Sequence, residues 1–330
     1  MEKSTRRRRE EMVGRIFPRS IPRLWCPPVT HYRPDGSLDR DRILAHVQAL
    51  APHVGGLLVP GSTGDGWELS RVQKLELLDI VSPLAARLGL YVLVGALERT
   101  TDEMLSFIDS LGQRIGTAPL SGIVVCAPSG AGKTETEIEA SLDRVLGLAL
   151  PTAIYQLPQV TGNMFTAGMV ANLAARHPNL FMLKDSSGGD SVAKADLDLG
   201  GLFLVRGAET GYRSWLKPRG PYDGFLLSTA NWLAPQLAAI AAGTRTGDLD
   251  RQVDAAVAGA FDLVPGYPTG NAFGNSAKLM DQVMAFGDGA ARAPGPFSRD
   301  GRPFPRELVQ RAVDLAAAEG LLTAKGYMKS

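Results

Sequence analysis

Lys184 has the sequence environment of a nucleophilic amine. It ends the short apolar run 180–183 and is followed by the polar, glycine-rich residues 185–189. An apolar surround disfavours the charged form of a lysine, lowers its pKa and leaves a neutral amine that can attack a carbonyl carbon. A solvated turn after a strand is the alternative interpretation. The local sequence leaves both open.

Two further segments carry side chains that would complement such an amine. Tyr155 stands in the preceding apolar run, and neighbouring strands lie about 4.8 Å apart, so its phenol could carry protons to and from the amine. Ser62 and Thr63 lie within Gly61–Gly64 and offer hydroxyls and backbone N–H groups that suit a carboxylate or a phosphate. The alternatives are a core tyrosine with a satisfied hydroxyl and an ordinary loop.

The catalytic interpretation of these residues is strengthened by the strands and helices that would position them. From about residue 20 to residue 243 the chain repeats a short β-rich run followed by a stretch with helical apolar spacing. The eight predicted strands are Leu24–Val29, Gly56–Val59, Tyr91–Val94, Gly122–Cys126, Ala153–Leu157, Leu180–Lys184, Phe203–Val205 and Gly224–Leu227. Strict alternation requires parallel strands, and eight units in roughly 220 residues favour an α/β fold of the (β/α)₈ TIM-barrel type. The active site of such a barrel lies at the carboxyl ends of its strands.

Three parts of the chain are predicted. Residues 1–19, with the run Arg6–Arg9, are expected to form a flexible basic tail, and residues 20–243 the catalytic barrel. Residues 244–330 are expected to form a C-terminal helical extension. Its predicted helices are Asp248–Val264, Ser276–Phe286 and Pro305–Ala318, separated by the Gly/Pro-rich segments 265–274 and 287–303.

Helices within the barrel have recognisable ends. The spacing of apolar residues predicts helices over Arg71–Leu88 and Thr101–Ile115. Ser70 and Thr101 are expected as N-caps, and Gly89 and Gly116 as the residues where the helices stop.

Composition excludes several function classes. The 330 residues include 45% apolar and 21% charged residues, and 35 basic against 34 acidic side chains give a net charge of +1. No global field therefore indicates binding to nucleic acid or to a membrane surface. No apolar stretch reaches the roughly 18 residues of a membrane span, so we expect a soluble cytoplasmic protein.

The residues that commonly bind metals do not form a site in the sequence. His31, His46, His53 and His177 are scattered without ligand spacing, so neither a metal nor an organic cofactor is expected. Cys26 and Cys126 each lie in an apolar run and are expected to be small buried hydrophobic residues.

Three segments together resemble a known family. The segments Gly61-Ser62-Thr63-Gly64-Asp65, Tyr155-Gln156-Leu157-Pro158-Gln159-Val160-Thr161-Gly162 and Lys184-Asp185-Ser186-Ser187-Gly188 are similar to those of the dihydrodipicolinate synthase and N-acetylneuraminate lyase family of class I aldolases. The resemblance runs from about Ile21 to the final helices.

The resemblance implies a mechanism and a role for each matching residue. Lys184 would form a Schiff base with pyruvate or another 2-oxo acid, and Tyr155 would be the acid–base phenol. Ser62 and Thr63 would bind the substrate carboxylate, and Thr63 would also join the proton relay. The pocket would be lined by Gly207 and Ser228. The family also implies a homo-oligomer, a dimer or a tetramer built from dimers.

Two departures from the family narrow the substrate. Members that make dihydrodipicolinate carry a tyrosine in the loop where this chain has Ala127–Gly132, and an arginine where it has Val160. The missing arginine would bind a second carboxylate. The resemblance therefore favours cleavage of a 2-oxo sugar acid by an aldolase. Dehydration of a 2-keto-3-deoxy sugar acid and true 4-hydroxy-tetrahydrodipicolinate synthesis are the alternatives.

A second motif suggests a different class of protein. Ala127–Thr134 follows a predicted strand and comes close to the phosphate-binding loop of nucleotide-binding proteins. The match is loose, because Ala127 replaces the first glycine and Pro128 removes a backbone donor. Nucleotide binding is therefore the weaker alternative, and a barrel that only binds its ligand is a third.

Overall fold

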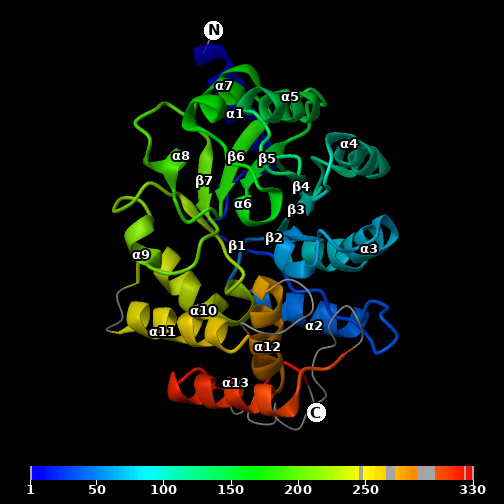
Figure 1. Cartoon of the computed structure of the whole chain (residues 1–330), viewed down its shortest axis with the longest axis vertical. Helices are drawn as coiled ribbons and strands as arrows, with labels where there is room; N and C mark the ends of the chain where they lie inside the picture. Colours follow the sequence, from blue (N-terminus) through cyan, green and yellow to red (C-terminus); the bar gives the residue numbers. More distant parts are fainter. Residues whose placement is uncertain (1, 245–247, 265–271, 288–301, 323–324, 329–330) are drawn as a thin grey trace.

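The barrel predicted from the sequence is present. The structure is a computed structural model that describes residues 2–244, 248–264, 272–287, 302–322 and 325–328. Eight parallel strands close in sequence order, with β8 pairing with β1. The strands are β1 (Leu24–Cys26), β2 (Gly56–Val59), β3 (Tyr91–Gly95), β4 (Leu120–Cys126), β5 (Thr152–Gln156), β6 (Leu180–Asp185), β7 (Phe203–Arg206) and β8 (Gly224–Leu226). The fold is therefore a (β/α)₈ TIM barrel (Figure 1).

Helices connect the strands around the outside of this barrel. They are α2 (Arg40–Leu50), α3 (Arg71–Leu88), α4 (Thr101–Ser110), α5 (Glu135–Leu146), α7 (Ala167–Arg176), α8 (Ser191–Lys194), α9 (Tyr212–Trp215) and α10 (Ala230–Ala241), with the short turns η1 (Ser62–Gly64), η2 (Gly112–Arg114) and α6 (Pro158–Thr161). Helix α3 has its predicted ends, because Ser70 and Gln73 form a capping box and Gly89 adopts a left-handed conformation. The N-cap of α4 is Thr100, one residue before the predicted Thr101.

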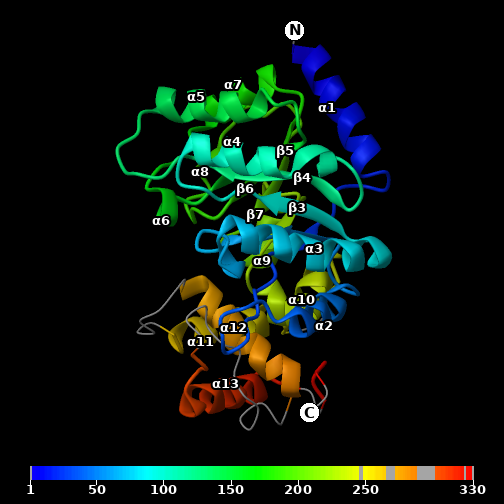
Figure 2. The same ribbon diagram turned by 90° about the vertical axis from the view of Figure 1, so that its right-hand side faces the viewer.

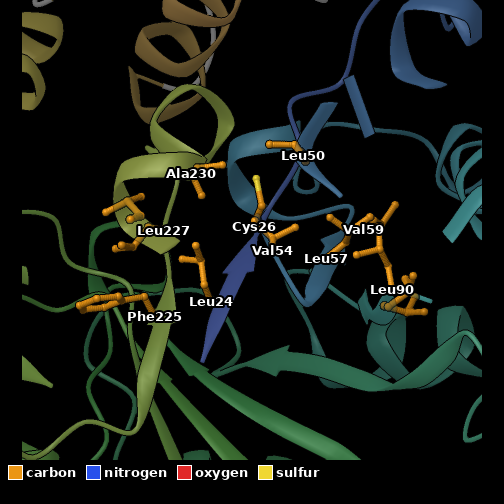
Figure 3. Close-up of a cluster of buried hydrophobic side chains, with 14 of the residues drawn as sticks. Leu24, Cys26, Leu50, Val54, Leu57, Val59, Leu90, Phe225, Leu227 and Ala230 are labelled. Atoms are coloured by element: carbon orange, nitrogen blue, oxygen red, sulfur yellow. The ribbon is translucent and has the colours of Figure 1, made fainter. Parts of the chain in front are cut away.

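Alternation along the strands divides the core into two clusters. One cluster fills the barrel with alternate strand residues such as Leu58, Ala153 and Met182. The other lies between the strands and the helices. Figure 3 shows part of the second cluster, with side chains such as Leu24 and Leu57 of the strands and Leu50 of α2. The inward-facing positions at the carboxyl ends of the strands are thereby left for the site.

The amino-terminal segment is a helix, so the predicted flexible tail was wrong. Helix α1 (Glu2–Ile16) packs against α7 and β6, and Phe17 beyond it makes edge-to-face contacts with the rings of Trp25 and Tyr91. Arg9 is only 2% exposed and donates hydrogen bonds to the carbonyls of Leu180, Ala174 and Gly200. The arginine run therefore includes a buried anchor, which a segment with so much charge does not suggest.

Within the described part of the chain, three helices follow the barrel, as predicted. They are α11 (Leu249–Asp262), α12 (Ala272–Phe286) and α13 (Arg306–Ala318). Figures 1 and 2 both show them at the opposite end of the long axis from α1. The predicted Gly/Pro-rich connectors lie largely outside the described residues. Among the residues that the structure describes, no helix has the length and apolarity that crossing a bilayer requires.

Helix α12 is fixed to the barrel through a buried carboxylate. The Asp281 oxygens lie 2.8 Å from His31 Nε2, 2.9 Å from His46 Nδ1 and 3.1 Å from an Arg42 nitrogen. His31 and His46, which are scattered in the sequence, therefore meet at one aspartate. Their rings serve to attach the extension.

Candidate active site

A cavity of about 440 Å³ opens at the carboxyl ends of the strands. Its lining residues are Ser62, Thr63, Trp67, Glu68, Arg99, Tyr155, Leu157, Gln159, Val160, Lys184, Ser186, Ser187, Gly188, Gly207, Ala208, Glu209, Leu226, Ser228 and Phe261. All six of the residues predicted from the sequence are among them. Strands far apart in the sequence bring these side chains together, and their individual roles remain predictions.

Lys184 is a buried amine on the inner face of β6. Its side chain is 4% exposed, and it lies in register with Tyr155 of β5 and Val205 of β7. Burial lowers the pKa of Lys184 from 10.5 to about 7, although the negative charge of Glu209 acts in the opposite direction. A large fraction of the lysine is therefore an uncharged nucleophile near neutral pH.

Tyr155 lies beside this amine, with the Lys184 Nζ atom 3.9 Å from the centroid of its ring. Burial raises the pKa of the Tyr155 phenol, although its hydrogen bonds with Ser186 and Ser62 act in the other direction. The phenol therefore keeps its proton at neutral pH and can donate it. The hydroxyls of Ser186 and Ser62 extend the phenol into a short chain of exchangeable protons.

The turn η1 presents Ser62 and Thr63 to the cavity from the end of β2. Both side chains are buried, and the Trp67 indole donates a hydrogen bond of 2.9 Å to Ser62 Oγ. The turn is closed by backbone bonds from Gly64 and Gly66 to the carbonyl of Gly61. Two hydroxyls are thus fixed on the wall next to the Tyr155 phenol.

Gly207 makes room for the lysine. A Cβ atom at this position would lie 2.1 Å from Ser186 Oγ and 2.8 Å from Lys184 Cε. Both distances are far inside contact, so any larger residue would displace the two side chains. The glycine at the end of β7 is therefore a requirement of the site.

Ser228 lines the cavity and is bound to Glu209, a residue to which the sequence analysis assigned no role. Its hydroxyl donates a 2.7 Å hydrogen bond to Glu209 Oε1. Thr229 donates to Glu209 through both its hydroxyl and its backbone N–H, and the Tyr212 hydroxyl donates to Glu209 Oε2 at 2.9 Å. Glu209 is therefore a rigidly oriented carboxylate in the same cavity as the lysine.

Sequence reasoning missed Glu209 and Ser186. Ser186 could have been found from its spacing, because it lies two residues after Lys184 and therefore on the same face of the strand. Glu209 comes four residues after the predicted strand Phe203–Val205, and no local signal connects it to Ser228 and Thr229, which follow the next strand.

The loop that resembles a phosphate-binding loop is occupied by its own side chains. The backbone N–H and hydroxyl of Thr134, the N-cap of α5, donate to the carboxylate of Glu137 at 2.7 and 2.8 Å. Asn163 Nδ2 ties the loop to its neighbour by donating to the carbonyls of Pro128 and Gly130. A carboxylate therefore already occupies the helix end where a phosphate would bind, which argues against nucleotide binding.

The described part of the chain contains no cluster of side chains that could bind a metal ion. Across those residues, no three His, Cys, Asp or Glu side chains are grouped so that they could hold a metal ion. Both cysteines are buried, as predicted, and burial raises the pKa of Cys26 and of Cys126. Neither thiol has the character of a nucleophile.

Comparison with known proteins gives a consistent result. The model of the dihydrodipicolinate synthetase family matches residues 20–256. An uncharacterised DapA-like lyase from Thermofilum pendens is 28% identical over 311 residues, covering 89% of this chain and 96% of that protein. The 4-hydroxy-tetrahydrodipicolinate synthase of Chlamydia trachomatis serovar D is 29% identical over 161 residues. That match covers 48% of this chain, which thus spans about half (54%) of the length of that relative.

Solved structures share the fold at low sequence identity. YagE from E. coli K12, a protein of the dihydrodipicolinic acid synthase family in complex with pyruvate, superimposes with a TM-score of 0.75 at 19% identity. The match covers 91% of this chain and 99% of that one. A variant of the Sulfolobus solfataricus 2-keto-3-deoxygluconate aldolase, in complex with L-2-keto, 3-deoxy-galactonate, gives 0.73 at 14% identity with the same coverage. These likenesses extend over the barrel and the helices that follow it.

Proposed function

Because the chain belongs to the dihydrodipicolinate synthetase family, we propose that it is a lyase that forms a Schiff base between Lys184 and pyruvate or another 2-oxo acid. The observation that carries this proposal is the buried Lys184 amine, with its pKa lowered to about 7 beside the Tyr155 phenol. Binding alone requires neither a neutral amine nor an adjacent proton donor. The comparisons support a lyase of this family, and the substrate is our inference.

The first step is condensation of the amine with the substrate ketone. The neutral Lys184 nitrogen attacks C2 of the 2-oxo acid, and Tyr155 supplies the proton that the departing hydroxyl needs to leave as water. The product is a protonated imine on Lys184. The hydroxyls of Ser62 and Thr63 bind the substrate carboxylate and so hold C2 in reach of the nitrogen.

The second step uses the imine as an electron sink. The Tyr155 phenolate left by the first step removes the proton from the C4 hydroxyl and so becomes a phenol again. The C3–C4 bond breaks, and its electron pair moves through C2 to the imine nitrogen. An aldehyde leaves, and an enamine remains on Lys184. Protonation of the enamine at C3 and hydrolysis then release pyruvate, with Tyr155 again as the proton donor.

Hydroxyl side chains on the cavity wall, among them Ser186, Ser187 and Ser228, favour a hydroxylated substrate. Val160, which stands where members that make dihydrodipicolinate carry an arginine, lines the cavity without a charge, and the cation of the lining is Arg99. Glu209 accepts the Ser228 hydroxyl proton and so orients the Ser228 oxygen as an acceptor for sugar hydroxyls. We therefore propose cleavage of a 2-oxo sugar acid. Dehydration of a 2-keto-3-deoxy sugar acid starts from the same imine and is the second candidate.

Borohydride trapping tests the imine directly. Incubation with pyruvate and borohydride should inactivate the protein irreversibly and add the mass of a reduced pyruvate adduct to the Lys184 peptide. Lys74 is an equally buried lysine outside the cavity, so its peptide should stay unmodified. A protein that retains full activity, or an adduct on another lysine, would refute the proposal.

The natural substrate requires a second experiment. A panel of 2-oxo sugar acids, with pyruvate release as one readout and loss of water as the other, separates cleavage from dehydration. Size-exclusion chromatography with light scattering tests the homo-oligomer that the family resemblance implies.

A further inference from the structure

We infer that Lys278, on the C-terminal helix α12, is a positioning residue for the Ser62–Thr63 turn and acts through Asp65. The inference rests on the proposed function, in which Ser62 and Thr63 bind the substrate carboxylate. It assigns the helical extension a part in substrate binding.

Asp65 is the residue through which the extension reaches the site. It immediately follows the turn η1, and its Oδ2 atom accepts hydrogen bonds from Tyr32 Oη at 2.7 Å and from Lys278 Nζ at 2.5 Å. The side chains of Lys278 and Asp65 are 3% and 6% exposed. The pair is therefore shielded from water, where an ion pair is strong only while both partners are present.

The conformation of Asp65 needs this support. Its φ of 60° lies in the left-handed region, which is unfavourable for a residue with a Cβ atom. Its backbone N–H bonds to the carbonyl of Ser62, and its own carbonyl accepts from Glu68 and Leu69. One residue thus sets the direction of the chain both into and out of the turn. A carboxylate fixed by two donors keeps that residue in its strained conformation.

The rest of the turn is pinned from the barrel side. Thr30 Oγ1 donates a 2.7 Å hydrogen bond to the carbonyl of Gly64, and a Cβ atom on Gly64 would lie 2.4 Å from the carbonyl oxygen of Pro28. The turn therefore lies between the loop after β1 on one side and α12 on the other. Among the contacts that the structure describes for the Asp65 carboxylate, Lys278 is the only positively charged partner.

The lysine is itself held in place by its helix. Asp281 lies one turn further along α12 and is bound by His31, His46 and Arg42. His31 and Tyr32 are consecutive, so the same loop contacts α12 at Asp281 and shares Asp65 with Lys278. Movement of α12 would consequently be transmitted to Asp65 and to the hydroxyls of the turn.

Lys278→Met tests the inference with two readouts from one assay. The pyruvate concentration that gives half-maximal borohydride-trapped imine should rise about 10- to 100-fold, because the substrate carboxylate loses oriented donors. The rate at saturating pyruvate should fall by less than about three-fold, because Lys184 and Tyr155 are unchanged. Lys74→Met, which removes a buried lysine paired with Glu98 at 2.6 Å, is the matched control and should leave the half-saturation value unchanged.

A double variant distinguishes positioning from general loosening of the fold. If Lys278 acts through Asp65, Asp65→Asn combined with Lys278→Met should raise the half-saturation value no further than Lys278→Met alone. Effects that multiply would contradict the inference. Tyr32→Phe removes a donor from the same carboxylate oxygen without leaving a buried charge, and should raise the value about three- to ten-fold. If Lys278→Met does not fold, this variant decides the question.

The wild-type protein separates this inference from the proposed function. If the wild type forms no imine with pyruvate, the proposed function is wrong. If it forms the imine and both Lys278→Met and Tyr32→Phe bind pyruvate normally, the function stands and the positioning role of Lys278 is overturned.

Discussion

The amine of Lys184 lies over the face of the Tyr155 ring, 3.9 Å from its centroid. The two residues are direct neighbours in the barrel, because the register of β5 and β6 pairs Tyr155 with Lys184. An amine that is largely uncharged above about pH 7 and a protonated phenol are thus held together in one cavity. Most of the reactivity that we propose depends on this one pairing.

The rate of imine formation should follow the protonation of Lys184. Only the neutral amine attacks a ketone, and burial lowers the pKa of this amine to about 7. The rate with pyruvate should therefore increase up to about pH 7 and level off above it. Stopped-flow measurement of trapped imine checks this. A rate that keeps rising beyond about pH 9 would mean that burial does not tune the lysine. The Tyr155→Phe variant should form the imine more slowly, but its rate should rise over the same pH range.

Lys184→Met should stabilise the protein at low pH while abolishing imine formation. The folded pKa of about 7 lies below the value of 10.5 for an unperturbed lysine, so the unfolded chain binds more protons between these two values. The stability penalty is complete below about pH 7 and disappears as the pH rises towards 10.5. It amounts to roughly 5 kcal/mol at its maximum.

Urea unfolding at two pH values measures this penalty. The free energy of unfolding of Lys184→Met should exceed that of the wild type by several kcal/mol near pH 6, and by little near pH 10. An equal difference at both values would indicate that the substitution acts through packing alone.

Tyr155→Phe should reduce proton transfer while leaving the fold intact. The change removes only the hydroxyl, and loss of a positioned acid–base group lowers a rate by about 10²- to 10⁴-fold. Exchange of the pyruvate methyl protons into deuterated water measures the step. Ser186→Ala removes one hydrogen-bond partner of the phenol and should give a smaller loss. The double variant should be no slower than Tyr155→Phe, since Ser186 acts through the phenol.

Much of the barrel could be predicted from the sequence because its signals are local. Short apolar runs followed by Gly, Pro, Ser or Thr identify all eight strands, although Leu24–Val29 shortens to Leu24–Cys26 in the structure. The strand order of a barrel then brings Ser62, Tyr155 and Lys184 to one end without further information. The resemblance to a family assigned roles to the same residues.

The remaining features depend on contacts between distant residues. Asp65 and Lys278 are separated by 213 positions, and each has an ordinary local sequence. The hydroxyls of Ser228 and Thr229 donate hydrogen bonds to Glu209 because the closed barrel places the ends of β7 and β8 side by side. The pattern of apolar residues does not predict these bonds. Charged side chains that end in buried pairs look the same in the sequence as charged side chains in water.

Arg9→Ala should destabilise the protein by at least about 3 kcal/mol, because it removes the donor of several hydrogen bonds and leaves buried carbonyls without partners. Arg7, two residues away, is the matched control. It forms an exposed pair with Glu11 at 2.8 Å, so Arg7→Ala should change the stability by less than about 0.5 kcal/mol. Thermal unfolding of both variants checks the difference. Equal melting temperatures would restore the interpretation of residues 1–19 as a flexible tail.

Gly207→Ala should abolish imine formation in a protein that still folds. The added methyl would meet Ser186 Oγ at 2.1 Å and Lys184 Cε at 2.8 Å. Both belong to side chains that can swing away into the cavity, so the clash is relieved by moving the catalytic groups while the backbone stays in place. Trapping with borohydride should therefore show little adduct, and the circular dichroism spectrum should match the wild type.

Gly168→Ala provides the control for this substitution. Gly168 lies on α7, where a Cβ atom would approach only Thr166 Oγ1, at 3.9 Å. An alanine in a helix is favoured over glycine by up to about 1 kcal/mol, so this variant should be as active as the wild type and slightly more stable. If Gly207→Ala also forms the imine at the wild-type rate, Lys184 must reach the substrate by a path that does not pass Gly207. The geometry of the site described above would then be incorrect.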